Sequence, residues 1–228
     1  MENKESIKKA EESAHAFKQF SVQLKEIHTN VPPDYYDNTR LIIQRYWHQK
    51  RFEVIKSMLK NSTGLILDIG CNGGTFTNII KKATSNSTII GIDIHKEAVK
   101  YAAKKYDDIS FLVGDGQSLP FRNDLFDLIT CLEVLEHMPQ PDRSLKEINR
   151  CLKVGRNAIL LIPDVKNFLF KIIWYLWLKT LGKIWRGAHI QELDEKQIEA
   201  LINNAQLRLV KKRKSHLGML TIMKISKP

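Results

Sequence analysis

Three carboxylates in the first half of the chain could together hold one ligand that carries hydroxyl and amino groups. Asp68 precedes a glycine-rich turn, Asp93 ends the next apolar run about 20 residues later, and Asp115 follows a third run. A carboxylate at the second position can accept hydrogen bonds from both hydroxyls of a ribose. The tendency of aspartate to occupy turns explains each position separately, but it explains their joint spacing poorly. The spacing therefore favours one ribose-containing ligand that lies across the ends of parallel strands.

The turn that begins at Asp68 reads DIGCNGG. A carboxylate this close to a helix N-terminus repels phosphate but can hold an ammonium group, which favours a zwitterionic or cationic ligand over a pyrophosphate. Gly70 and Gly74 tolerate positive φ, and Asn72 between them is the next most tolerant residue type. The alternative interpretation is an ordinary tight turn between a strand and a helix.

A second group of polar side chains could take a proton from a bound substrate or hold a metal ion. Glu133, Glu136 and His137 are spaced i, i+3 and i+4, which would place them on one face of a helical turn. Three interpretations stay open. His137 takes a proton from an acceptor hydroxyl, or the cluster binds Mg²⁺ or Zn²⁺ with His189 as a further ligand, or these residues are structural.

The elements that must position these residues alternate between strand and helix. Such alternation indicates parallel strands joined by crossover helices, and the last two strands read as an antiparallel pair. We therefore predict an α/β fold: a doubly wound, mostly parallel seven-stranded sheet with helices on both faces. The strands are predicted over 65–67, 88–93, 109–113, 125–132, 157–162, 207–212 and 218–225, and the helices among them over 75–83, 97–105, 141–152 and 194–205.

This pattern resembles the class I S-adenosylmethionine (SAM)-dependent methyltransferases, in particular the type 11 and ubiquinone-biosynthesis O-methyltransferases. Their first motif is usually written DxGxGxG, and this chain matches it except that Asn72 replaces the middle glycine. The resemblance covers residues 51–164 tightly and implies SAM as the cofactor. The cofactor-binding residues that it implies are Asp68, Gly70, Cys71, Asn72, Gly74, Asp93, Ile94, Asp115 and Gly116.

The second group carries a resemblance of its own. ExxEH followed by a later histidine is similar to the metal site of small-RNA 2′-O-methyltransferases, and GAH at 187–189 stands where the ubiquinone-biosynthesis enzymes have GTH. The resemblance implies catalytic Glu133 and His137, and a metal set of Glu133, Glu136, His137 and His189. The implied function is methyl transfer from SAM to a small, apolar or lipid-like acceptor, at oxygen. Two alternatives are an RNA methyltransferase and a catalytically degenerate SAM-binding scaffold.

Residues 1–60 are predicted to form an N-terminal helical cap, followed by a SAM-binding domain over 61–228. Two adjacent prolines at 32 and 33 separate a first helix from a second helix over 38–60, because proline removes helix hydrogen bonds. The aromatic residues of this cap could line an acceptor pocket, and the alternative is packing in the core. These residues are Tyr35, Tyr36, Tyr46 and Trp47.

An amphipathic insertion is predicted over 165–189, after the fifth strand. If residues 167–185 form one helix, its cations and its tryptophans lie on opposite sides, as in helices that lie in a membrane interface. A lid or a dimer contact is the alternative. The cations are Lys171, Lys179, Lys183 and Arg186, and the tryptophans are Trp174, Trp177 and Trp185.

The 228 residues carry a net charge of +11, and from Val165 onward 13 Lys and Arg stand against 4 Asp and Glu. This excess predicts an anionic partner, with a membrane surface favoured over nucleic acid because no RNA-binding module is visible. Three cysteines without CxxC spacing indicate a reducing compartment. Without an apolar signal region or a run of about 18 apolar residues, we expect a cytoplasmic protein. It would associate peripherally with the inner face of the membrane.

Overall fold

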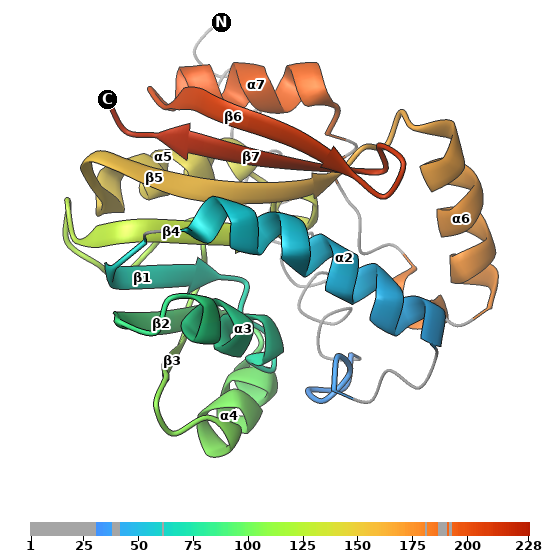
Figure 1. Ribbon diagram of the computed structural model, residues 1–228, viewed down its shortest axis with the longest axis horizontal. Helices are drawn as coiled ribbons and strands as arrows, with labels where there is room; N and C mark the ends of the chain where they lie inside the picture. The colour runs from blue at the N-terminus through green and yellow to red at the C-terminus, as the bar shows by residue number, and fades with distance from the viewer. Residues whose placement is uncertain (1–30, 38–41, 61, 181, 187–190, 192) are drawn as a thin grey trace, which may run out of the picture.

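A seven-stranded sheet with the strand order β3-β2-β1-β4-β5-β7-β6 forms the centre of the described structure (Figure 1). The computed structural model describes residues 31–37, 42–60, 62–180, 182–186, 191 and 193–228. Strand β7 pairs antiparallel with β5 and β6, and the other pairs are parallel. The predicted mostly parallel α/β fold is confirmed. The strands are β1 (Gly64–Ile69), β2 (Ser87–Asp93), β3 (Ser110–Val113), β4 (Phe126–Leu132), β5 (Leu152–Pro163), β6 (Arg208–Ser215) and β7 (Leu220–Ser226).

Helices cover both faces of this sheet. One face carries α2 (Ile42–Leu59), α3 (Thr75–Ala83) and α4 (Lys96–Lys105), and the other carries α5 (Pro141–Cys151) and α7 (Glu195–Asn204) (Figure 1). Successive side chains of a strand point to opposite faces, so a strand covered on both sides must be apolar throughout. In β1, Ile66 packs with the core under α2 and α3, whereas Leu67 packs with the core under α5 and α7.

Local sequence signals determine most of the element boundaries. Helix α3 begins and ends where the sequence predicts it. Helix α7 begins with a capping box, in which the Asp194 carboxylate accepts from the Gln197 amide at 2.9 Å and the Gln197 side chain accepts from the Asp194 amide at 2.8 Å. Strand β5 begins at Leu152, five residues before its predicted start, because Leu152 already pairs with Phe126 of β4.

The insertion after β5 is not one helix, so that prediction is wrong. Helix α6 (Phe168–Lys179) ends well before Trp185, and a short 3₁₀ helix, η2 (Lys183–Trp185), follows the turn. The turn closes on Trp177, whose carbonyl accepts from the Gly182 amide at 2.8 Å. A Cβ at Gly182 would lie 2.0 Å from Trp177 Nε1, so only glycine allows this close return.

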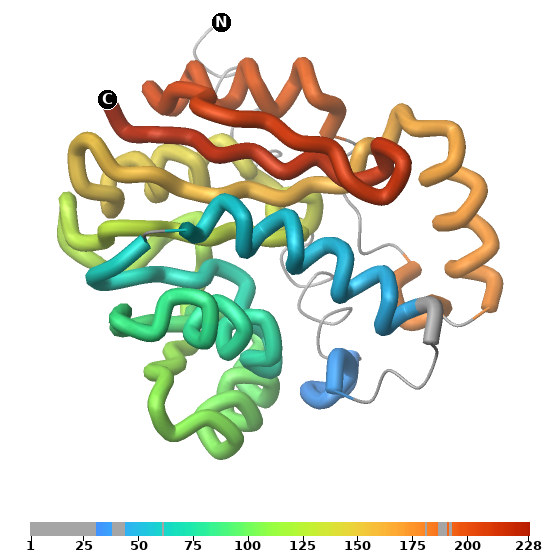
Figure 2. The backbone as a smooth tube through the Cα atoms, viewed as in Figure 1, coloured from blue at the N-terminus to red at the C-terminus, as the bar shows by residue number. Residues whose placement is uncertain are grey.

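The predicted cap is described only in part. The first predicted helix, over residues 1–30, lies outside the described residues, and α2 packs on α3 and on the β6–β7 pair. Residues 31–37 and α6 lie on the side of the sheet toward which β1 and β4 point (Figure 2). The division into a cap and a SAM-binding domain stays a prediction.

Candidate functional site

The glycine-rich turn after β1 is tied to the end of β2 by hydrogen bonds. Asp93 accepts from the Asn72 amide through Oδ2 and from the His95 amide through Oδ1, both at 2.8 Å. Gly70 (φ 77°), Asn72 (φ 44°) and Gly74 (φ 80°) all have positive φ. Asparagine therefore occupies the left-handed conformation that the sequence assigns to this position. Asp93 consequently anchors the turn as well as facing any ligand beside it.

The strand register brings the predicted cofactor residues to one edge of the sheet. Ile69 pairs with Ile92, and Asp93 pairs with Val113, so Gly70, Asp93 and Asp115 follow three adjacent strands. Asp115 accepts from the Gln117 amide at 2.8 Å. The neighbouring predicted residues are a buried Cys71, an Ile94 that is 39% exposed, and a buried Gly116.

These residues fit an adenosyl ligand. Asp93 and Asp115 are half-buried, so their carboxylates can reach solvent and a ligand alike. At Gly116 a Cβ would lie 2.7 Å from both Ile69 and Met138, so the backbone at this edge lies against a closed apolar wall. Two half-buried carboxylates at one edge of the sheet suit a ribose and an adenine, which offer hydroxyl and amino hydrogens.

Asp68 does not reach the ligand edge in this conformation. Its side chain is 2% exposed, and its oxygens accept from Thr77 Oγ1 at 2.7 Å and Thr130 Oγ1 at 2.6 Å. Burial raises the pKa of Asp68 to about 6, although the bonds from Thr130 and Thr77 oppose that rise. The idea that Asp68 itself seats the methionine part is therefore not supported by its contacts, which join β1 to α3 and β4.

Glu133 leaves β4 in the left-handed conformation (φ 57°), with its amide bonded to the Leu161 carbonyl at 2.8 Å. It precedes the 3₁₀ helix η1 (Leu135–His137) rather than sharing one helical turn with it, so the predicted common face is not formed. The carboxylate of Glu133 instead forms an ion pair with Arg51 of α2.

Glu136 is 1% exposed, and its Oε2 has no hydrogen-bond partner among the described residues. Burial and, secondarily, the charge of Glu133 raise the pKa of Glu136 well above its usual range. A neutral carboxyl is a poor metal ligand. Among the described residues no group of three or more His, Cys, Asp or Glu side chains is placed to hold an ion. His189 lies outside them, so the metal set stays a hypothesis that Glu133 and Glu136 fit poorly.

Aromatic rings from three separate segments meet beside η1. The ring of Trp185 stacks on His137 with centroids 6.3 Å apart and meets Tyr35 edge-on at 5.5 Å. Of the predicted cap aromatics, Tyr46 is 57% exposed and does not contribute. Trp47 packs on His216 at the β6–β7 turn, away from this cluster.

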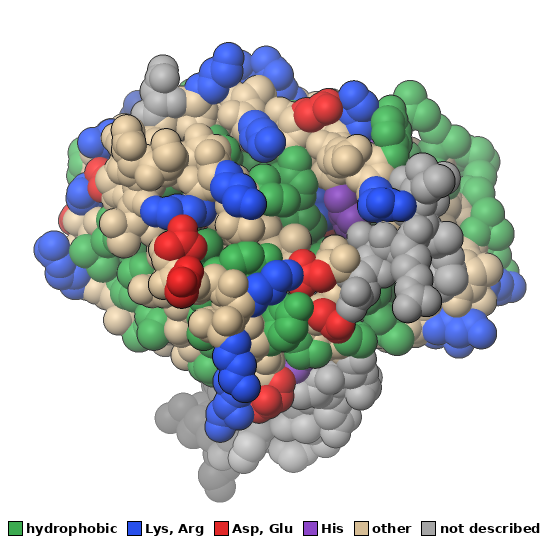
Figure 3. Space-filling view, turned by 60° about the horizontal axis from the view of Figure 1, so that its bottom comes forward, with side chains coloured by type: hydrophobic (Ala, Val, Ile, Leu, Met, Phe, Trp, Pro, Cys, Tyr) green, Lys and Arg blue, Asp and Glu red, His purple; other side chains and the backbone are tan. Residues whose placement is uncertain are grey.

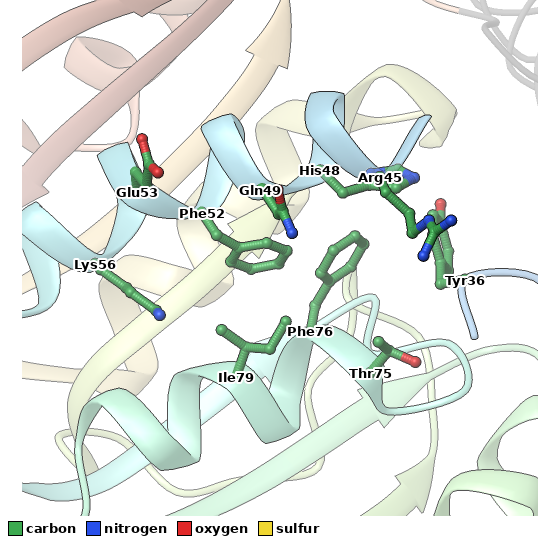
Figure 4. Close-up of a pocket in the computed structure, with 10 residues that line it drawn as sticks. All are labelled: Tyr36, Arg45, His48, Gln49, Phe52, Glu53, Lys56, Thr75, Phe76 and Ile79. Atoms are coloured by element: carbon green, nitrogen blue, oxygen red, sulfur yellow. The ribbon is translucent and has the colours of Figure 1, made fainter. Parts of the chain in front are cut away.

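A pocket of about 370 Å³ opens between α2 and α3 (Figure 4). Phe52, Phe76 and Ile79 form its apolar floor, and Arg45 and Lys56 stand at opposite ends. Its wall contains Tyr36 and His48, whose rings are 5.6 Å apart, and Phe76, which also lies under Arg51. The pocket therefore shares its inner wall with the Arg51–Glu133 pair.

Sequence reasoning missed Arg51, His48 and Gly73, and it assigned Trp185 to the amphipathic insertion and not to this site. A signal existed for Arg51 and His48, since His48 lies four residues before Phe52 and Arg51 lies four residues before Ile55, the spacing of neighbours on one helix face. No local signal marks Gly73, where a Cβ would lie 2.0 Å from the carbonyl oxygen of Pro33.

Comparisons with known proteins agree with this geometry. A family described as a methyltransferase domain matches residues 67–160. A protein of Thermotoga maritima named demethylmenaquinone methyltransferase is 32% identical over 60% of this chain, which spans 62% of that relative. A protein of the same name from Lactobacillus johnsonii is 30% identical over 74% of each chain. The structure of magnesium protoporphyrin IX methyltransferase from Synechocystis with bound SAH shares the fold, with a TM-score of 0.64 over 84% of this chain, 90% of that chain and 19% identity.

Proposed function

Because this chain belongs to the class I SAM-dependent methyltransferases, we propose that it transfers the methyl group of SAM to an oxygen of an apolar, quinone-like acceptor. The observation that carries the proposal is the convergence of Tyr35, Trp185 and His137 at the end of β4. Flat aromatic side chains bind a planar ring by stacking and exclude water from it. The names of the two bacterial relatives point to the same acceptor class.

The proposed reaction requires few catalytic groups from the protein. SAM supplies an electrophilic methyl group, and an acceptor oxygen attacks it while the carbon–sulfur bond breaks. Most of the rate then comes from alignment of the two reactants and from exclusion of water. The acceptor hydroxyl must also lose its proton, and in this proposal a ring nitrogen of His137 takes it as a general base.

Replacing His137 tests this role. We expect His137→Gln to lower kcat by roughly 10²–10⁴-fold at neutral pH, the usual contribution of a general base. The loss should shrink as the pH approaches about 10, where a phenolic acceptor ionises without help. The measurement is kcat between pH 6 and 10 with a hydroquinone or catechol that carries a short prenyl chain.

SAM affinity, measured by calorimetry, serves as the control for the His137 variant and should stay within about twofold. A loss that is constant across the pH range would contradict the base role and leave His137 as a stacking partner of Trp185. Mass analysis of the product distinguishes a methyl ether from a ring-methylated product and so tests transfer to oxygen itself.

We also propose that the protein collects such an acceptor from an anionic membrane surface through α6. No described helix has the length and apolar character needed to cross a membrane, so association would be peripheral. Along α6 a stripe at i, i+4 spacing is exposed: Phe168 at 73%, Ile172 at 41% and Leu176 at 55%. Figure 3 shows hydrophobic side chains gathered at the right of the view, the side on which α6 lies in Figure 1.

The exposed face of α6 differs from the one expected from the sequence. Trp174 and Trp177 are half-buried, and Trp174 stacks on the buried Phe170 with centroids 5.8 Å apart. The apolar stripe of Phe168, Ile172 and Leu176 therefore faces outward, while Lys171 and Lys179 on the same helix are exposed. Exposed apolar residues flanked by lysines suit the boundary between anionic headgroups and acyl chains.

Replacing the stripe should release the protein from membranes. We expect Phe168→Ser/Ile172→Ser/Leu176→Ser to abolish the salt-resistant binding to anionic vesicles, because burial of each such side chain contributes about 1.5–3 kcal/mol. Sedimentation with phosphatidylglycerol vesicles at low and high salt measures it. Val154→Ser is a matched control, since Val154 is 67% exposed at the start of β5. Wild-type protein that stays in the supernatant at low salt would contradict the membrane proposal.

The basic run on β6 is less available for an anionic partner than its composition suggests. Lys212 pairs with Glu195 and Glu199, and Lys214 pairs with Asp164 and Glu195. Internal partners therefore neutralise two of the four cations in the run Lys211, Lys212, Arg213 and Lys214, which weakens the case for phosphate binding along this strand and for RNA as the acceptor.

A further inference from the structure

Among the residues that the structure describes, Arg51 is the only Lys or Arg whose side chain is buried. Its side chain is 3% exposed, and it extends from α2 to the loop that follows β4. Burial of a charge is costly unless the charge is paired and hydrogen-bonded. The partners of this guanidinium therefore show what it does at the acceptor site.

Three groups surround the guanidinium. Nη1 donates to Glu133 Oε2, Nη2 lies 2.9 Å from His48 Nδ1, and Cζ lies 4.4 Å from the centroid of the Phe76 ring. A guanidinium can only donate hydrogen bonds, so His48 Nδ1 must accept and the imidazole must be neutral. Burial and the charge of Arg51 lower the pKa of His48 to about 4, in agreement with that assignment.

The two groups that bind the Arg51 guanidinium, Glu133 and His48, are also common metal ligands. A carboxylate oxygen and a neutral imidazole nitrogen are the protein ligands that divalent ions such as Zn²⁺ commonly take. Here the guanidinium already binds both groups and neutralises Glu133. The remaining carboxylate of the predicted metal set, Glu136, is 1% exposed, and its Oε2 accepts no hydrogen bond from the part of the chain that the structure describes.

We propose that Arg51 takes the place of a divalent ion in the acceptor site: it neutralises Glu133 and positions the Glu133 carboxylate for the acceptor hydroxyl, so that methyl transfer needs no metal. This inference rests on the proposed function. The backbone of Glu133 is held from β5 by the Leu161 carbonyl and its carboxylate is held from α2, which leaves the side chain 25% exposed for an acceptor. Arg51 is thus a positioning residue that acts through Glu133.

Ion binding tests the inference without any acceptor. Calorimetric titrations of the full chain with Mg²⁺ and with Zn²⁺ should give the same result for the wild type and for Glu133→Gln. Turnover should also be unchanged in excess EDTA. An ion that binds the wild type but not Glu133→Gln would overturn the inference, as would turnover that EDTA abolishes and Mg²⁺ or Zn²⁺ restores. The titrations decide this even if the proposed acceptor class is wrong.

Kinetics test the positioning role. We expect Arg51→Gln to lower kcat about 10²-fold, the usual cost of a misplaced group, while SAM affinity stays within about twofold. Arg51→Lys should recover part of the loss, because lysine restores the positive charge but not the two-donor geometry of the guanidinium. Lys50→Gln is the matched control, since the neighbouring Lys50 pairs with Glu53 on the exposed side of α2. Wild-type kcat in Arg51→Gln would overturn the inference.

A double variant keeps the test decisive if Arg51→Gln fails to fold. Arg51→Gln/Glu133→Gln removes both charges together and leaves two neutral amides, so it avoids an unpaired buried charge. We expect it to fold and to turn over as slowly as Glu133→Gln alone. A double variant that turns over about 10²-fold more slowly than Glu133→Gln alone would show that Arg51 acts independently of Glu133, and it would overturn the inference. That factor is the usual cost of a misplaced group.

Discussion

Asp93→Ala should weaken SAM binding by on the order of 10²–10⁴-fold. We expect this carboxylate to accept from two ribose hydroxyls, and each hydrogen bond to a charged group is worth about 1.5–3 kcal/mol. Two ribose hydroxyls then account for about 3–6 kcal/mol, which converts to that range. The structure adds a second reason, because the same carboxylate accepts from the Asn72 and His95 amides and fixes the turn that the cofactor approaches.

Calorimetric titration with SAM measures this effect, and two further variants sharpen it. Asp93→Asn should have intermediate affinity, since the amide keeps one acceptor oxygen but loses the charge. Asp107→Ala makes the same chemical change at an exposed position before β3 and should leave SAM affinity unchanged. Wild-type affinity in Asp93→Ala would remove the main support for an adenosyl ligand at this edge.

The edge of the sheet that carries Asp93 and Asp115 was predictable because short stretches of sequence determine its turn, strands and helix. A glycine turn, a strand that ends in a carboxylate and a helix without proline each follow from short windows of sequence. The register that aligns Asp93 with Val113 then follows from parallel pairing, so Asp115 comes to the same edge. The contacts of Asp68 were not predictable in this way, because its partner Thr130 lies 62 residues away in the sequence.

The acceptor side was less predictable because tertiary contacts determine it. The end of α6 depends on how Gly182 returns to Trp177, and that contact places Trp185 on His137 instead of on the amphipathic helix. The partner of Glu133 comes from α2, 82 residues earlier in the chain. A spacing of i, i+3 and i+4 indicates a shared helical face only where a helix forms, and Glu133 has φ 57° instead.

Asp68→Asn should stabilise the protein at neutral and alkaline pH, although Asp68 belongs to the family motif. Burial raises the pKa of Asp68 to about 6, against the opposing bonds from Thr130 and Thr77, from a reference value of 3.8. The folded state therefore holds this proton more tightly than the unfolded state does. Its contribution to stability is fully present below about pH 3.8 and is lost as the pH rises through about 6.

Above pH 6 the ionised carboxylate costs about 3 kcal/mol relative to a neutral group, since one pKa unit corresponds to about 1.4 kcal/mol. Asparagine has the same shape without the charge, and one threonine hydroxyl can rotate to accept from its amide. We therefore expect the melting temperature of Asp68→Asn to exceed that of the wild type by on the order of 5–10 °C at pH 8. The two proteins should converge near pH 4, as followed by calorimetric melting.

Asp127→Asn is a control of opposite sign. Burial acts against the charge of Asp127, but Lys153 at 2.9 Å and the Leu65 amide at 3.0 Å outweigh it and lower its pKa. That carboxylate contributes stability above its unfolded pKa, and the contribution is lost as the pH falls, so its replacement should lower the melting temperature at pH 8. If Asp68→Asn is also less stable at pH 8, the prediction is wrong, because the bonds from Thr77 and Thr130 to the ionised carboxylate then outweigh the cost of its burial.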